Sequence, residues 1–213
     1  MRAATVESLR RQLREKFPQA HGLRAVAAAT ERVPASLFAP EAFPAGAVSE
    51  VVVAGPVSGL GLLVAGLLGE PEHGSPHPVL VLIDGADSFD PNSFSPAACS
   101  RVLWVRCRAA VEMLNAADLL ARDGNVPFLV LDATGLPRKD YQALRQASSW
   151  WRLKRIVEGN GGRLVVLAPF PMVPCARQRW QLAANLSLGD FDCPREELRQ
   201  RLRATPDRLT RAN

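Results

Sequence analysis

Short apolar runs recur along the middle of the chain and alternate with segments of helical periodicity. The runs lie at residues 51–53, 79–84, 101–105, 126–132 and 163–168. Their Val, Leu and Ile content is typical of strands that are buried on both faces. Helices are predicted over residues 62–68, 108–122 and 140–158, the last ended by residues 160–162. The alternation predicts an α/β fold in which helices flank a mainly parallel central sheet.

The phase of each helical pattern predicts which side chains are buried. The apolar side of the helix over residues 108–122 contains Val111, Leu114, Ala117 and Leu119. In the helix over residues 140–158, Trp151 joins Leu144 and Ala147 on the buried stripe. Trp150 is rotated from it by roughly 100° and is expected nearer the rim. Residues 180–188 predict a further strand or hairpin, and residues 194–202 a short basic helix followed by a frayed tail.

The N-terminal segment is separate from this alternation. Residues 5–17 predict an amphipathic helix whose apolar positions are Val6, Leu9, Leu13 and Phe17. Residues 22–44 are rich in Ala and Pro and are interpreted as a linker. The predicted organisation is an N-terminal helix and linker (1–44), a core (45–190) and a basic C-terminal helix and tail (191–213). The N-terminal helix either folds back on its own domain or binds a partner, since its apolar stripe must be buried somewhere.

A glycine-rich turn joins the first predicted strand to its helix. It contains Gly55, Pro56, Ser58, Gly59 and Gly61. This is the frame of a nucleotide-binding P-loop, G-x-x-x-x-G-K-[ST]. Counted from Gly55, however, the lysine falls on Gly61 and the hydroxyl on Leu62, and residues 60–68 contain no Lys, Ser or Thr. Without these groups nothing balances phosphate charge or holds Mg²⁺. The sequence therefore predicts a vestigial P-loop without a nucleotide cofactor, in a protein that is not an enzyme.

Composition and charge indicate which kinds of partner the protein can bind. The chain has 213 residues, a formal net charge of +5 and a pI of about 9.5. This charge permits binding to nucleic acid or to an acidic partner but does not establish it. No signal pattern begins the chain and no apolar run could span a bilayer, so a cytoplasmic protein without a membrane partner is expected.

The possible metal ligands do not form a convincing site. The cysteines are scattered, with no C-x-x-C pair, and reduced thiols are expected. His73 and His77 lie near Glu72, but in a polar loop that no regular element orders. No metal site is predicted.

Three segments resemble the RecA family of bacterial recombinases. Residues 42–59 (AFPAGAVSEVVVAGPVSG) resemble the family's segment that leads into its P-loop. Residues 82–91 (LIDGADSFDP) resemble its F-I-D-A-E-H-A-L-D-P motif, and residues 128–132 (FLVLD) its Walker B strand. The resemblance covers residues 43–189 and implies a RecA-like core.

The resemblance also shows which of the family's catalytic residues this sequence lacks. Ala86 occupies the position of the family's glutamate that activates the attacking water. Asp132 matches the Walker B carboxylate, but without a loop hydroxyl it has no Mg²⁺ to share, and it is expected to hydrogen-bond at the strand end. Asp84, Asp87 and Asp90 could suggest a hydrolytic carboxylate pair, yet the family's equivalent segment is structural apart from that glutamate.

The segments matching the family's DNA-binding loops are short. They are residues 133–139 and residues 169–175, the latter stiffened by prolines. What remains basic is the helix over residues 148–156, with Trp150, Arg152, Lys154 and Arg155 as candidate contacts for DNA or a partner. Three interpretations stay open: stacking with nucleic acid, a protein interface, or a core Trp beside a solvated basic face.

The whole chain is similar in size and pattern to the ImuA family, small RecA-like proteins encoded beside ImuB, a homologue of translesion polymerases. This resemblance implies a non-catalytic adaptor in damage-induced (SOS) mutagenesis and translesion synthesis, with an ImuB-like Y-family polymerase homologue as partner. A RecA-like DNA-binding or recombination-regulating protein and a weak ATPase are the alternatives. Self-association through the N-terminal helix and weak, non-specific DNA binding are further expectations.

Overall fold

A computed structural model of the chain describes residues 42–53, 59–68, 80–184, 186, 190 and 192–207. The chain divides into two compact units, Met1–Thr30 and Glu31–Asn213, and all described residues lie in the second. The predicted N-terminal helix of residues 5–17, with Val6, Leu9, Leu13 and Phe17, lies outside the described residues. So do Gly55, Ser58 and the loop that contains Glu72, His73 and His77.

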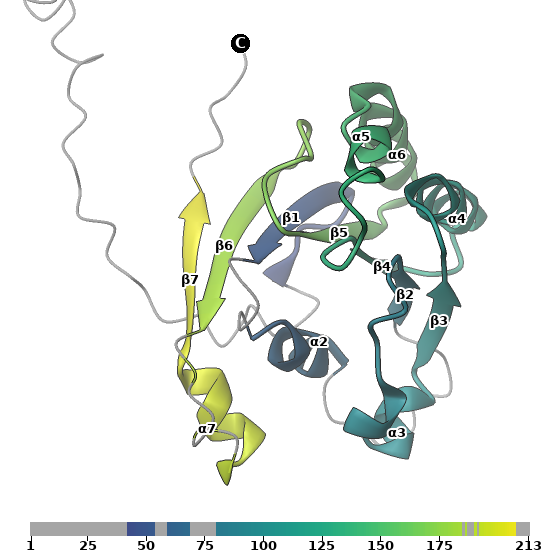
Figure 1. Cartoon of the computed structure of the whole chain (residues 1–213). Helices are drawn as coiled ribbons and strands as arrows, with labels where there is room; N and C mark the ends of the chain where they lie inside the picture. Colours follow the sequence, from purple (N-terminus) through teal and green to yellow (C-terminus); the bar gives the residue numbers. More distant parts are fainter. Residues whose placement is uncertain are drawn as a thin grey trace, which may run out of the picture. The chain divides into compact units, whose positions relative to one another are not determined.

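A seven-stranded sheet forms the centre of the second unit (Figure 1). Its strands are β1 (Ala47–Val53), β2 (Leu80–Asp84), β3 (Val102–Arg106), β4 (Phe128–Asp132), β5 (Arg163–Ala168), β6 (Gln178–Ala184) and β7 (Leu202–Asp207). Their order is β3-β2-β4-β5-β1-β6-β7, and every neighbouring pair is parallel except β6 and β7. The predicted α/β fold with a mainly parallel sheet is confirmed.

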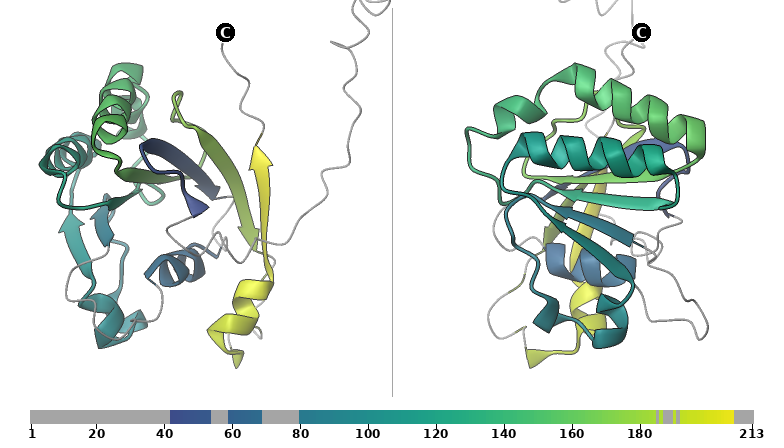
Figure 2. Two further views of the ribbon diagram at one scale, coloured as in Figure 1. Left: turned by 180° about the vertical axis from the view of Figure 1, so that it is seen from behind. Right: turned by 90° about the vertical axis from the view of Figure 1, so that its right-hand side faces the viewer.

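Helices cover both faces of the sheet (Figure 2). They are α2 (Leu60–Leu68), α3 (Pro96–Cys99), α4 (Ala110–Asp123), α5 (Tyr141–Leu144), α6 (Ala147–Asn160) and α7 (Arg195–Gln200), with a short 3₁₀ helix, η3, at Pro91–Ser93. One apolar cluster lies between the sheet and α4 and α6, around Trp150. A second lies beneath α2, around Leu63, and includes Leu202 of β7. Each cluster covers one face of the strands, so the central strands are buried on both faces.

The apolar side of α4 differs from the prediction. Val111 and Leu119 are 56% and 70% exposed, whereas Leu114 and Ala117 are buried as expected. The buried face also contains Ala110, Met113 and Ala121. The helix is therefore rotated toward its small residues, which allow it to lie close to α6 and the sheet.

The single helix predicted over residues 140–158 is wrong, because it is two helices, α5 and α6. The indole N–H of Trp150 donates a hydrogen bond to the carbonyl oxygen of Leu144, at the end of α5. The expected roles of the two tryptophans are reversed: Trp150 is fully buried and Trp151 is 47% exposed. The prediction counted helical positions continuously from residue 140 to 158. Because α5 and α6 are separate helices, positions on one do not predict which face of the other is buried. The predicted end of α6 is correct, since Gly161 has a φ of 74°.

The basic helix predicted over residues 194–202 ends at Gln200, and the frayed tail predicted after it is wrong for residues 203–207. Together with Leu202, they form β7, which pairs antiparallel with β6. Leu202 and Ala204 point into the cluster beneath α2 and are fully buried. Their spacing of two residues is a strand signal, but it is too short to be decisive in a sequence.

Candidate functional site

The carboxyl ends of β1, β2 and β4 meet at one edge of the sheet, beside the start of α2. Asp84 and Asp132, the last residues of β2 and β4, are direct partners in the parallel register. Gly59 precedes α2 with a φ of 77°, and its carbonyl oxygen accepts from the N–H groups of Leu62 and Leu63, each at 3.0 Å. A cavity of about 770 Å³ opens at this edge. It is lined by Val53, Gly59, Leu60, Gly61, Leu62, Val64, Leu82, Ser88, Phe89, Asp90, Ser93, Phe94, Asp132, Thr134, Gly135, Leu186, Cys193, Arg195 and Leu198.

Asp84 holds the loop that follows β2. Its carboxylate is buried and accepts from the N–H groups of Ala86 (3.2 Å), Ser88 (3.1 Å) and Phe89 (2.9 Å). The indole N–H of Trp104 on β3 donates to the same carboxylate, at 3.2 Å. A carboxylate has about four acceptor positions, and these four donors occupy them. Asp84 therefore has a structural role.

Asp132 is 7% exposed and lines the cavity. Its Oδ1 accepts from the N–H (2.9 Å) and the hydroxyl (2.7 Å) of Thr134. Its Oδ2 accepts one long hydrogen bond, 3.4 Å from the hydroxyl of Ser88, which lies equally far from Asp84. Because a hydroxyl has one proton, it can donate to only one of the two carboxylates at a time. Burial raises the pKa of Asp132, and the charge of Asp84 adds to the effect.

The other two aspartates of the loop are each engaged locally. Asp87 has a φ of 55° and receives the guanidinium of Arg106, whose Nε donates to Oδ1 at 2.6 Å. This hydrogen bond lowers the pKa of Asp87. Asp90 caps η3, accepting from the N–H of Asn92 at 3.0 Å. The loop's carboxylates thus hold its own backbone and a neighbouring strand, and they do not converge as a hydrolytic pair.

The cavity does not fit a magnesium nucleotide. Residues 54–69 contain no Lys or Arg, and Gly61 and Leu62 occupy the lysine and hydroxyl positions. A Cβ at Gly61 would meet nothing within 4 Å, so space for a side chain exists there and the charge is missing. The cation that lines the cavity, Arg195, donates to the Ser93 carbonyl oxygen and lies 5.3 Å from the ring centroid of Phe94. Among the described residues, polyphosphate would therefore meet carboxylates, hydrocarbon and the guanidinium of Arg195, without the lysine and hydroxyl that it needs.

The two segments that match DNA-binding loops are fastened to the core. The hydroxyl of Tyr141 donates to the Ala133 carbonyl oxygen at 2.9 Å. In the second segment, the N–H groups of Met172 and Val173 donate to Oε1 of Glu50, at 2.7 and 3.1 Å. Glu50 lies fully buried in β1, and sequence reasoning missed it because nothing marks a single acidic residue in an apolar run as a structural anchor.

The candidate residues of the basic helix are not brought together as one surface. Trp150 is in the core, and Arg152 forms an ion pair with Asp118 of α4 at 2.8 Å. Lys154 pairs with Glu158 at 3.3 Å and lies 5.0 Å from the ring centroid of Trp151.

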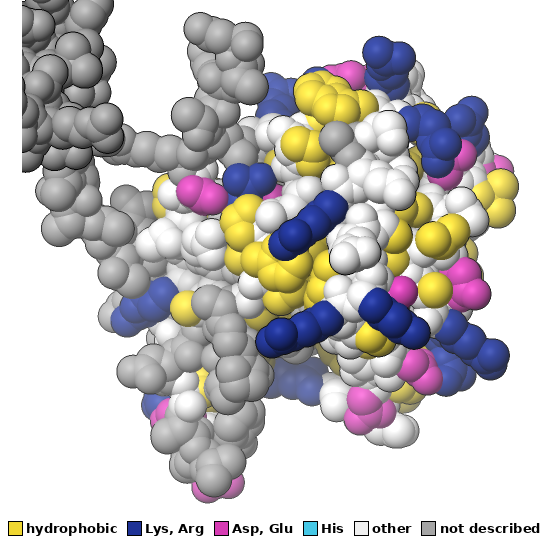
Figure 3. All heavy atoms as spheres, turned by 45° about the horizontal axis from the view of Figure 1, so that its top comes forward, with side chains coloured by type: hydrophobic (Ala, Val, Ile, Leu, Met, Phe, Trp, Pro, Cys, Tyr) yellow, Lys and Arg dark blue, Asp and Glu magenta, His cyan; other side chains and the backbone are white. Residues whose placement is uncertain are grey.

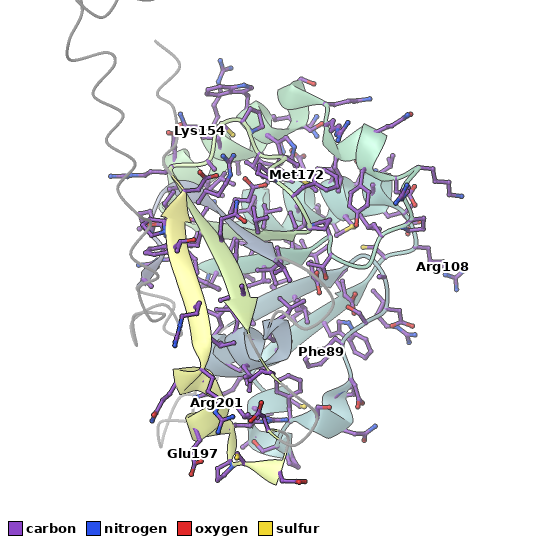
Figure 4. The ribbon with its side chains drawn as sticks, turned by 60° about the vertical axis from the view of Figure 1, so that its left-hand side comes forward. Phe89, Arg108, Lys154, Met172, Glu197 and Arg201 are labelled. Carbon is purple, nitrogen blue, oxygen red and sulfur yellow. The ribbon has the colours of Figure 1, made fainter. Side chains whose placement is uncertain are left out.

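Trp151, Arg152 and Arg155 are exposed on this helix. Trp151 was missed as a candidate because its helical phase was counted across the break before α6. On the side of the molecule that carries α5 and α6, Lys and Arg side chains lie beside exposed hydrophobic groups (Figure 3). Lys154 and Met172 lie away from Phe89, which lines the cavity (Figure 4).

Comparison with known proteins supports the fold. No protein-family model matches the chain, and no curated protein matches it by sequence. Among solved structures it is similar to the RadB recombinase, with a TM-score of 0.50 and 14% sequence identity over 68% of this chain and 78% of that chain. The fold is RecA-like. At this identity the likeness shows the fold alone, so function must be argued from the site.

The described residues contain no group of His, Cys, Asp and Glu side chains that could hold a metal ion. Across the same ranges, no helix is long and apolar enough to cross a membrane.

Proposed function

We propose that this protein is a non-catalytic RecA-like adaptor in damage-induced, error-prone translesion DNA synthesis. It acts in the cytoplasm and binds an ImuB-like, Y-family polymerase homologue, as the resemblance to the ImuA family implies. In this proposal the RecA-like core serves as a docking scaffold, and neither binding nor hydrolysis of ATP is needed.

One observation carries the proposal: the edge of the sheet where a RecA-like ATPase performs its chemistry is a cavity lined mostly by apolar side chains and by carboxylates. Asp84 is saturated by its own loop and by Trp104, and Oδ1 of Asp132 accepts two hydrogen bonds from Thr134. Leu62 and Ala86 occupy positions whose side chains would hold Mg²⁺ and activate water. Yet the sheet around this edge is completely buried and well ordered by hydrogen bonds. A core that keeps its fold after losing its chemistry is best explained by binding.

The adaptor role is tested by co-purification and by mutagenesis in cells. The full chain is expected to co-purify with the polymerase homologue encoded by the same organism, and loss of its gene to abolish damage-induced mutation. A chain carrying Ala86→Glu should complement as well as wild type, because no hydrolytic step is required. Unchanged induced mutation frequency after gene loss would contradict the proposal.

The ATPase alternative is tested separately. Calorimetry with Mg²⁺-ATP is expected to show no binding tighter than about millimolar, because the electrostatic clamp of phosphoryl transfer is missing. Micromolar binding would favour the weak ATPase.

A second candidate, a RecA-like DNA-binding or recombination-regulating module, is favoured by the outer face of α6. There Trp151 is exposed beside Lys154 and near Arg155, and an aromatic ring with cations is a common platform for single-stranded DNA. A titration with a labelled single strand distinguishes it from the adaptor: Trp151→Ala should weaken binding if this face is used. Leu103→Ala removes a similarly exposed apolar side chain on β3, away from α6, and serves as the control.

A further inference from the structure

We infer that the cavity at the carboxyl ends of β1, β2 and β4 binds a small apolar molecule that carries a protonated amine, with the ammonium group against Asp132. Its volume of about 770 Å³ is within the range of small-molecule sites in proteins. The inference does not rest on the proposed function, because a ligand of this class could occupy the cavity of an adaptor or of a DNA-binding protein.

The walls of the cavity select an apolar body. They are formed largely by Val53, Leu60, Leu62, Val64, Leu82, Phe89, Phe94, Leu186 and Leu198. The rings of Phe89 and Phe94 are stacked with centroids 4.9 Å apart. Trp104 meets Phe89 edge-on at 5.3 Å and holds it in place. A fixed aromatic wall favours a flat, aromatic ligand, because little side-chain entropy is lost on binding.

The charge of the cavity selects the polar end of the ligand. Asp132 is more than nine-tenths buried, and the described residues give its Oδ2 only the long bond from Ser88. A buried carboxylate with a free acceptor position is costly unless a donor or a cation reaches it. An ammonium group is a hydrogen-bond donor and a cation at once, so it can form a charge-assisted hydrogen bond with Asp132.

The remaining charged groups that line the cavity do not reverse this preference. Asp90 is satisfied within its own loop by Asn92 and by the hydroxyl of Ser93, at 3.2 Å. The guanidinium of Arg195 is engaged by the Ser93 carbonyl oxygen and by the ring of Phe94. Arg195 keeps its positive charge, but it is not among the groups that shift the pKa of Asp132. An anionic group placed against Asp132 would therefore meet a second negative charge there, and the cavity is expected to reject phosphates.

A matched series of indoles tests the inference on the full chain. Tryptamine, tryptophol and indole-3-propionate present an ammonium, a hydroxyl and a carboxylate on similar apolar bodies. Calorimetry is expected to show the tightest binding for tryptamine, about tenfold or more over indole-3-propionate, with tryptophol between them. No saturable binding of tryptamine, or equal binding of the three, would overturn the inference.

Three variants locate the effect. Asp132→Asn is expected to reduce the preference for tryptamine to about threefold or less and to leave tryptophol binding unchanged. Asp87→Asn removes an exposed carboxylate that does not line the cavity, and should keep the full preference. Leu62→Trp fills the cavity and should abolish binding of all three indoles, which provides a second test if the Asn variant fails to fold. A preference that survives Asp132→Asn, or binding that survives Leu62→Trp, would place the ligand elsewhere.

Discussion

Breaking the buried ion pair between β1 and β6 should strongly destabilise the fold. Glu50 is fully buried, and its Oε2 accepts from Nε of Arg179 at 2.6 Å. The two residues are register partners, so the pair lies directly across the β1–β6 ladder. Arg179 also donates to the Val173 carbonyl oxygen at 3.0 Å and lies 3.5 Å from the carboxylate of Asp207 on β7. The pair thus joins two strands to the segment after β5 and to the last strand.

The change in the free energy of unfolding depends on which buried polar groups each substitution leaves without a partner. Glu50→Ala leaves a guanidinium that is only 15% exposed without its main partner, and two backbone N–H groups without their acceptor. Removal of one member of a buried pair costs about 3–5 kcal/mol, and we expect Glu50→Ala to fall in this range. The double variant Glu50→Leu/Arg179→Met removes both charges, yet the N–H groups of Met172 and Val173 stay unsatisfied. Each unsatisfied N–H group costs about 1–3 kcal/mol, so this variant should retain a deficit of about 2 kcal/mol or more.

Urea unfolding of the full chain, followed by circular dichroism near pH 7, measures both values. The matched control is Glu158→Ala, which breaks an exposed i,i+4 pair with Lys154 and should change the free energy of unfolding by less than about 1 kcal/mol. A loss below about 1 kcal/mol for Glu50→Ala would refute the reasoning. A double variant as stable as wild type would show that the two N–H groups find other acceptors.

Four further outcomes are expected. Burial raises the pKa of Asp132 above its ordinary value of 3.8. The protonated carboxyl group therefore stabilises the folded state below pH 3.8, and this stabilisation is lost as the pH rises through the pKa of the folded state. Asp132→Asn should flatten the resulting fall in melting temperature above about pH 4. Gly61→Ala should raise the free energy of unfolding by about 0.5 kcal/mol, since a Cβ has open space there, and a clear loss in urea unfolding would contradict this. Binding of single-stranded DNA, measured by a mobility shift, should be weak and lost by about 200 mM salt, and retention at that salt would exclude a purely electrostatic mode. Leu9→Asp/Leu13→Asp should abolish self-association in light scattering, and an unchanged mass would show that the predicted N-terminal helix is not the assembly element.

The sequence by itself determined the fold class and most of the central sheet. Runs such as residues 79–84 and 163–168 became β2 and β5 within one residue, because a strand buried on both faces is composed mostly of apolar residues. The chemistry missing from the P-loop was also a property of the sequence, since Gly61 and Leu62 carry neither charge nor hydroxyl in any fold. Gly161 ended its helix as predicted, because a positive φ is a local requirement.

Only the tertiary structure decided which side chains are partners and which are exposed. The exchange between Trp150 and Trp151 depended on a break between α5 and α6, which no local periodicity marks. The anchoring of residues 172 and 173 by Glu50 joins positions more than a hundred residues apart in the chain. The apolar cavity at the carboxyl ends of the strands needed side chains from α2, η3 and α7 together. Local patterns specify each element, but a site is formed by contacts between elements, and those contacts are fixed only when the whole core packs.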